Sequence, residues 1–119
     1  MASDRVWNLE RLLSVTGDDR ELQRELINLF LVDTASRLAN LPAAIEAGNI
    51  DHLRLQAHAV KGASANMGAD RLQEACAKME SAALSGDAHP FEKLYEEVDV
   101  EFDRVKEFCT RYLATIAAE

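Results

Sequence analysis

The stretch from about Phe91 to Ala117 carries the clearest pattern in the sequence. Its apolar residues recur at alternating steps of three and four: Tyr95, Val98, Phe102, Val105, Cys109, Tyr112 and Ile116. Because an α-helix turns once in about 3.6 residues, this spacing puts one apolar stripe along one side of a helix. A stripe of this length must be covered by other elements, so the sequence predicts a long helix packed against partners.

Turn-forming residues are scarce, with five glycines and two prolines among 119 residues. A chain with so few of them cannot change direction often, which favours a few long helices over many short strands. We predict four further helices: about Val6–Leu13, about Asp19–Ala47 with a bend or break at Pro42, about Ile50–Met67, and one that follows the break at Gly68, with Asp70 near its cap, and runs to about Leu84. The expected fold is all-α: one domain over residues 1–119, an antiparallel four-helix bundle whose short N-terminal helix caps one end.

Composition and charge narrow the possible functions. The net charge is −8, and an acidic chain repels nucleic acid and anionic lipid, so neither is an expected partner. No apolar run approaches the roughly 20 residues that a membrane span needs, and the N-terminus lacks the pattern of a secretory signal. Cys76 and Cys109 fall on helical core faces, which is typical of buried, reduced thiols. We therefore expect a soluble, cytoplasmic domain.

The segment Ile50–Met67 carries two parallel lines of residues. One line is a core stripe made of Leu53, Ala57, Val60, Ser64 and Met67. Beside it a second line recurs at steps of four, three and four, and Leu55 and Gly62 join the same face: Arg54, His58, Lys61 and Ala65. His58 is therefore predicted to lie at the centre of a partly exposed patch.

Two features of this patch are unfavourable in ordinary structural terms. Gly62 in the middle of a helix costs about 1 kcal/mol relative to alanine. Lys61, one turn from His58, disfavours the protonated ring and so favours the neutral, nucleophilic form. Both features are explained if the patch binds an anionic group. A neutral imidazole can attack phosphorus, and Lys61 can then neutralise the negative charge of the phosphoryl group on His58. The missing side chain at Gly62 leaves room for another protein to approach. On these residues alone, a surface histidine beside a tolerated glycine remains the alternative.

A longer stretch of sequence resembles a known family. Residues 57–69, Ala-His-Ala-Val-Lys-Gly-Ala-Ser-Ala-Asn-Met-Gly-Ala, followed by Leu72, Ala75-Cys76, Met79-Glu80 and Gly86, are similar to the signature of bacterial histidine phosphotransfer domains. Upstream, Leu29-Phe30, Ala47-Gly48-Asn49 and the opening Leu9 to Asp18 are also similar to the family. The resemblance therefore covers nearly the whole chain, in order.

The resemblance implies a phosphoryl carrier of two-component phosphorelays. His58 matches the family's phosphoryl-accepting histidine, which takes the group from a receiver-domain phosphoaspartate and passes it to another receiver aspartate. Lys61 matches its charge-neutralising lysine and Gly62 its small docking residue, while Ala63 departs from the serine that is frequent there. By their place around His58, further docking residues are expected: Arg54, Leu55 and Ala65.

The expected partners are a response regulator receiver domain and a hybrid sensor histidine kinase, bound by a monomer of this chain. Mg²⁺ is expected in the receiver; this chain is expected to hold no cofactor and no metal, since His52 and His58 are six residues apart and point in different directions on a helix. A glycine-rich ATP site is also missing from the sequence, so we expect a carrier rather than an enzyme.

Two other functions are alternatives to that of a phosphoryl carrier. A sensor kinase's dimerisation domain also phosphorylates a histidine, but its motif usually has an acidic residue next and a proline a few residues on. Here Ala59 and Ala63 occupy those positions. A non-catalytic adaptor that binds a signalling partner is the remaining alternative, and the joint presence of His58, Lys61 and Gly62 argues against it.

Overall fold

The computed structural model describes residues 5–86 and 90–118 of the chain. These residues form six α-helices and no strand: α1 (Leu9–Thr16), α2 (Arg20–Ala39), α3 (Leu41–Ala47), α4 (Ile50–Met67), α5 (Asp70–Ser85) and α6 (Phe91–Ala117). The prediction of an all-α fold is confirmed. Within the described part of the chain, none of the helices combines the length and the apolar character needed to cross a membrane.

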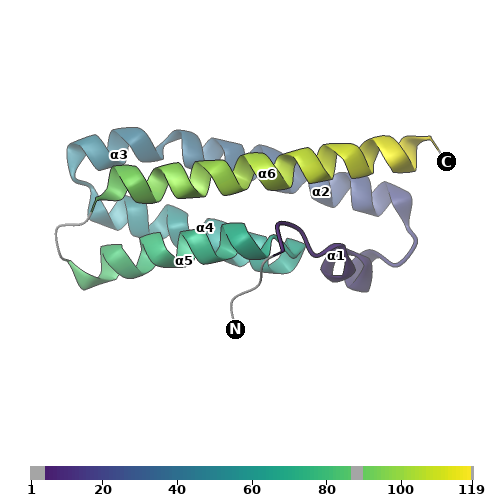
Figure 1. Ribbon diagram of the computed structural model, residues 1–119, viewed down its shortest axis with the longest axis horizontal. Helices are drawn as coiled ribbons and strands as arrows, with labels where there is room; N and C mark the ends of the chain where they lie inside the picture. Colours follow the sequence, from purple (N-terminus) through teal and green to yellow (C-terminus); the bar gives the residue numbers. More distant parts are fainter. Residues whose placement is uncertain (1–4, 87–89, 119) are drawn as a thin grey trace.

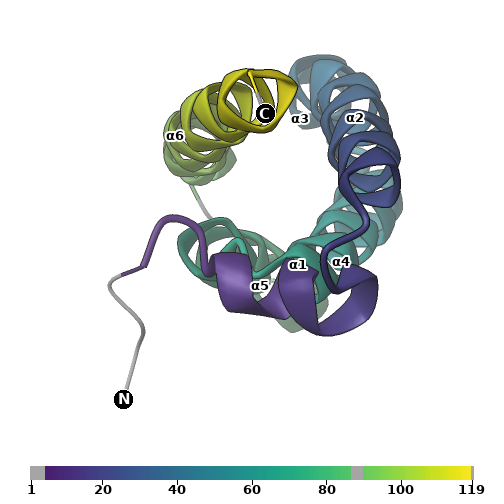
Figure 2. The same ribbon diagram turned by 90° about the vertical axis from the view of Figure 1, so that its right-hand side faces the viewer.

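The helices lie side by side along one long axis (Figure 1). α3 continues the line of α2, and α4, α5 and α6 run beside them. Viewed along the axis, these rods surround a common centre and α1 lies at one end, outside the ring (Figure 2). The ring closes because α4 contacts α2 and α5, and α6 contacts α5, α2 and α3.

The second predicted helix is broken near Pro42, as its sequence indicated. The structure ends α2 at Ala39 and starts α3 at Leu41, with Pro42 in the first turn of α3. Proline is tolerated there because the first N–H groups of a helix have no partner within it, whereas inside a continuous helix its ring would clash with a carbonyl of the preceding turn.

The two apolar stripes predicted from the sequence are largely buried in the core. All five stripe residues of α4 are buried, and α6 buries five of its seven: Val98, Phe102, Val105, Cys109 and Ile116. On α2, Phe30 and Thr34 are buried, whereas Leu31 is only half-buried. Both cysteines are unpaired, and burial raises the pKa of Cys109 to about 12. Such thiols are structural rather than reactive.

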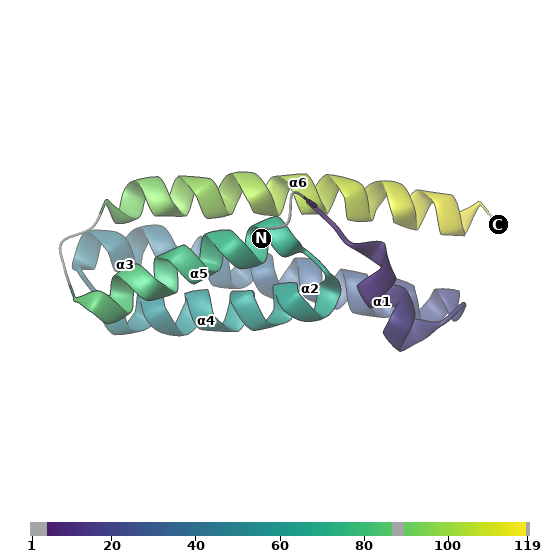
Figure 3. The same ribbon diagram turned by 60° about the horizontal axis from the view of Figure 1, so that its bottom comes forward.

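The first predicted helix, Val6–Leu13, is wrong at both ends. Residues 5–8 form an extended strap against the turn between α4 and α5 (Figure 3). Asn8 N–H donates to the Gly68 carbonyl at 2.6 Å, and the Trp7 indole N–H donates to the Met67 carbonyl at 2.9 Å. Because these donors bond to a distant turn, no helix is needed to satisfy them.

Gly68 is where the strap and the turn come closest. Its φ is +80°, and a Cβ built there would lie 2.2 Å from the Asn8 carbonyl oxygen. Gly48 offers a matched comparison, because its φ is +68° but nothing lies within 4 Å of a built Cβ.

We therefore predict that Gly68→Ala lowers the free energy of unfolding more than Gly48→Ala. A left-handed conformation costs a non-glycine residue about 1–3 kcal/mol at either site, and only Gly68→Ala must also displace the strap. Urea denaturation of both variants measures the difference. Equal losses would show that the strap yields without cost.

Candidate functional site

His58 lies in the middle of α4, on the side turned away from the core. Its neighbours Ala57 and Val60 are buried, whereas the His58 side chain is 66% exposed. The helix that carries it is closed at both ends: the Asn49 side chain accepts from the His52 N–H at 3.1 Å, and Gly68 ends the helix in a left-handed conformation. The imidazole is thus held on a firmly packed helix and remains accessible.

The other predicted patch residues share the accessible face of α4. Leu55 and Gly62 are exposed, and three more are half-buried: Arg54, Lys61 and Ala65. A Cβ built on Gly62 would meet nothing within 4 Å. Internal packing of the described residues therefore does not require a glycine at this position.

Glu80 on α5, named above only as part of the family resemblance and given no role, also belongs to the site. One of its carboxylate oxygens lies 2.6 Å from His58 Nδ1, and the other accepts a hydrogen bond from the Lys61 ammonium. The Glu80 side chain is only 13% exposed, against 32% for Lys61. The carboxylate therefore bridges the two residues from the inner side of the patch.

This bridge keeps Glu80 ionised. The hydrogen bond from Lys61 lowers the pKa of Glu80 below its usual value, burial acts in the opposite direction, and the contact with His58 adds to the lowering. The positive charge of Lys61 is therefore shared with the Glu80 carboxylate. It does not act on His58 alone, which was the expectation from the sequence.

The register of the hairpin formed by α4 and α5 places Glu80 opposite His58, and this register can be read from the sequence. α4 and α5 are antiparallel neighbours joined by the turn at Gly68-Ala69. His58 lies eleven residues before Ala69 and Glu80 eleven residues after it, since 69 − 58 = 80 − 69. Residues equally far from the turn of such a hairpin lie at the same height, so the two side chains can meet.

An apolar groove extends this face over α1 and α2. It encloses about 760 Å³ and runs between α1, α2 and the C-terminal half of α4, where Ala63 and Asn66 line it. Three apolar side chains of α1 and α2 are strongly exposed on the outer surface: Val15, Leu29 and Val32. Of these three, only Leu29 was named above, as part of the family resemblance, and none was predicted to be a site residue.

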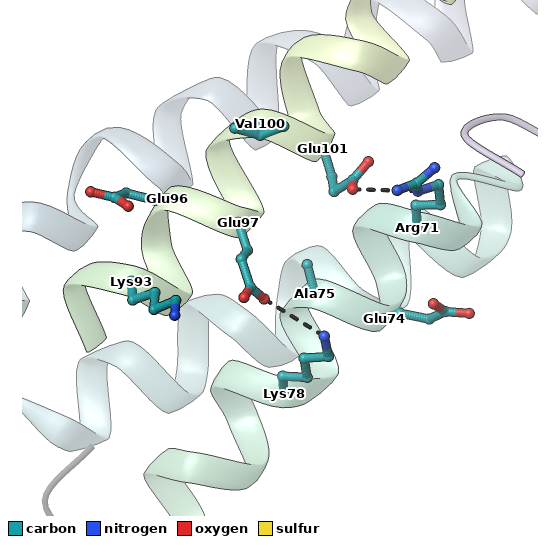
Figure 4. Close-up of a pocket in the computed structure, with 9 residues that line it drawn as sticks. All are labelled: Arg71, Glu74, Ala75, Lys78, Lys93, Glu96, Glu97, Val100 and Glu101. Atoms are coloured by element: carbon teal, nitrogen blue, oxygen red, sulfur yellow. Dashed lines mark ion pairs between the residues drawn. The ribbon is translucent and has the colours of Figure 1, made fainter. Parts of the chain in front are cut away.

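A second depression, between α5 and α6, has a different character (Figure 4). Most of its lining is charged, and oppositely charged residues pair across it: Arg71 Nε lies 3.3 Å from Glu101, and Lys78 Nζ lies 3.7 Å from Glu97. None of the predicted patch residues lines it. Ion pairs between the packed helices α5 and α6 explain the charged lining of this depression.

Comparisons with protein-family models and with solved structures point to the same family. The family model described as "Hpt domain" matches residues 25–110. The chain belongs to the Hpt domain family. A search of curated protein sequences finds no match. Among solved structures, histidine-containing phosphotransfer protein B from Pseudomonas aeruginosa PAO1 is similar, with 31% sequence identity, a TM-score of 0.86, and coverage of 95% of this chain and 98% of that one.

The chain is thus a histidine phosphotransfer carrier of phosphorelay signal transduction, in agreement with the resemblance seen in its sequence. The matched region contains α4 and α5 in full, and with them His58, Lys61 and Glu80.

The ion pair in the site leads to a prediction for stability. Because the pKa of Glu80 is lowered on folding, its carboxylate stabilises the folded state above the unfolded pKa, and this contribution is lost as pH falls through the folded pKa. Glu80→Gln should therefore lower the free energy of unfolding at pH 7, by about 1 kcal/mol or less. Urea denaturation should show the two proteins converging as the pH falls below the ordinary glutamate range. A gap independent of pH would contradict the ionic origin.

Proposed function

We propose that His58 is the residue that carries the phosphoryl group. The observation that carries this proposal is its position: an exposed imidazole at the centre of the patch, one helical turn from the cation of Lys61. A receiver domain presents its phosphoaspartate with bound Mg²⁺, the imidazole attacks in line, and the reverse step delivers the group to another receiver aspartate.

Lys61 is proposed to neutralise part of the charge on phosphorylated His58. A phosphoryl group brings up to about two negative charges, and an ammonium one turn away is a suitable partner for them. Lys61 is bound to Glu80 before transfer. The incoming group therefore competes with the Glu80 carboxylate for the same cation.

The receiver is proposed to dock on the face around His58. Gly62 provides a flat place on α4, and Arg54, Leu55 and Ala65 surround the histidine. The adjoining groove, with the exposed side chain of Leu29, adds apolar area of the kind that protein interfaces cover.

The proposal also covers the setting in which the carrier works and the steps that its partner proteins perform. We infer that it works as a cytoplasmic monomer, receives phosphoryl groups that originate on a hybrid sensor histidine kinase, and does not phosphorylate itself from ATP. We further interpret residues 1–119 as one phosphotransfer domain, an antiparallel four-helix bundle in which α2 and α3 share one rod and α1 caps an end. The two buried, unpaired cysteines are compatible with a reducing compartment.

His58→Gln is the direct test of the acceptor. The side chain lies outside the core, so the melting temperature should stay nearly unchanged. Incubation with a radiolabelled phosphorylated receiver domain should then label the wild-type protein and leave the variant unlabelled. If the variant were labelled to the same extent as the wild type, the phosphoryl acceptor would be another residue. If the wild-type protein bound the receiver but was never labelled, the protein would be an adaptor and not a carrier.

Gly62→Gln should separate stability from function. Glutamine is a better helix former by about 1 kcal/mol, and open space around Gly62 accepts its side chain, so the melting temperature should rise. The same side chain stands where the receiver must approach, and a displacement of about 1 Å can reduce a transfer rate about 100-fold.

Gly62→Ala is the matched control for this test. It should also raise the melting temperature, yet add too little bulk to obstruct docking, so transfer should remain close to wild type. If Gly62→Gln transferred normally, the docking role of this position would be excluded.

A further inference from the structure

We propose that Arg11 is a specificity-determining residue of the carrier, which selects receiver domains that bring a carboxylate to the groove between α1, α2 and α4. This inference rests on the proposed docking of a receiver at His58. It assigns a partner-selecting role to a residue of α1 and names the charge that the partner must carry there.

The groove is continuous with the face that carries His58. Ala63, which lines the groove, follows Gly62 directly in α4, and the groove extends from there between α1 and α2. α1 lies beside the C-terminal end of α4 (Figure 3). Since a stable protein interface covers about 800 Å² of each partner, a receiver that reaches His58 also extends over the groove.

The charges at the groove are unequally satisfied. Of the described residues that line it, two are charged: Arg11 and Asp33. Asp33 already has a cation, because Arg37 Nε lies 2.9 Å from its carboxylate, and Arg37 also donates to the Gln56 side chain at 3.1 Å. Arg11 is exposed, and no carboxylate of the described residues forms an ion pair with it. Within that part of the chain, the charge left unpaired at the groove is therefore positive.

The position of Arg11 separates it from the phosphoryl group. A Cβ built on Gly68 would lie 3.0 Å from Cβ and 3.1 Å from Cγ of Arg11, so the arginine stem rests over the turn that ends α4. Gly68 follows His58 by ten residues, which corresponds to about 15 Å along a helix. The carboxylate that Arg11 selects is therefore not the phosphorylated aspartate of the receiver.

Docking makes this charge important for the choice of partner. A receiver that covers the apolar walls of the groove also removes water from the guanidinium, and a charge that loses water without gaining a partner weakens binding. A carboxylate at this point replaces the lost hydrogen bonds, because the planar guanidinium can bind both of its oxygens. A receiver with a lysine or arginine at the same point is rejected by repulsion between like charges.

A purely structural role is the alternative explanation for Arg11. A cation near the C-terminal end of a helix interacts favourably with its last carbonyl groups, and the Arg11 stem lies beside the end of α4. The structural role predicts a loss of stability on substitution with no change in receiver affinity. The selecting role predicts a loss of affinity in a protein that is still folded.

The test compares Arg11→Glu with Arg24→Glu. Both substitutions reverse one charge at an exposed arginine that has no ion pair with the described residues, but Arg24 on α2 does not line the groove. The probe is the receiver domain, among those of the same genome, that exchanges phosphoryl groups fastest with the wild-type carrier. Isothermal titration calorimetry measures the Kd of its unphosphorylated form, and thermal melting checks the fold of each variant.

Arg11→Glu should raise the Kd about 10-fold or more, whereas Arg24→Glu should change it by about twofold at most. The deficit in transfer rate should shrink as the receiver concentration is raised, because the substitution acts on partner binding. A charge exchange then identifies the matching carboxylate. When lysine replaces each exposed aspartate or glutamate of the receiver in turn, one substitution should weaken binding to the wild type and restore binding to Arg11→Glu.

The outcomes separate this inference from the function on which it rests. If no receiver exchanges phosphoryl groups with wild-type His58, the proposed function fails and this inference fails with it. If exchange occurs but Arg11→Glu binds as tightly as the wild type, or no lysine substitution in the receiver restores its binding, only the role of Arg11 is overturned. If Arg11→Glu folds poorly, Arg11→Gln removes the charge without reversing it, and it should still bind the receiver more weakly than Arg24→Gln.

Discussion

The antiparallel pairing of α4 with α5 is the constraint on which the site depends. A turn of two residues, Gly68 and Ala69, joins the helices and sets their register, so that His58 and Glu80 lie at the same height. The strap before α1 rests against this turn, with the Asn8 carbonyl occupying the space that a side chain at Gly68 would need. Gly68, ten residues after His58 in the sequence, thereby helps to set the position of His58 relative to Glu80.

Two neighbouring faces of α4 have different tasks: one packs into the core, and the other carries the site residues. The core stripe, with Val60 and Ala57 fully buried, fixes the helix, and the adjacent face can then carry residues chosen for their chemistry. This separation explains why Gly62 is tolerated: its cost to helix stability is small compared with the burial of the stripe beside it. Since the receiver supplies metal and acidic pocket in the proposed mechanism, the carrier needs only a rigid, accessible imidazole and a means of orienting it.

The sequence predicted the parts of this structure that depend on local periodicity. α4 and α6 have the bounds expected from their stripes, and His58, Lys61 and Gly62 share a face because three- and four-residue spacing requires it. The errors have tertiary causes. Val6 to Asn8 leave the helical pattern because a distant turn offers better hydrogen-bond partners. The role of Glu80 was missed because it meets His58 only through the register of the hairpin, which periodicity within one helix does not reveal.

The Glu80–Lys61 pair also bears on why such a carrier can work in both directions. A lone cation beside the histidine would bind the phosphoryl group strongly in the phosphorylated state and so oppose its release. In this site the ammonium already has a carboxylate partner. Under the role proposed for Lys61, phosphorylation would exchange one anionic partner for another. The gain on phosphorylation is therefore smaller than the full attraction between ammonium and phosphoryl group. On this proposal the site would neither exclude the phosphoryl group nor retain it, which is the property that a relay requires.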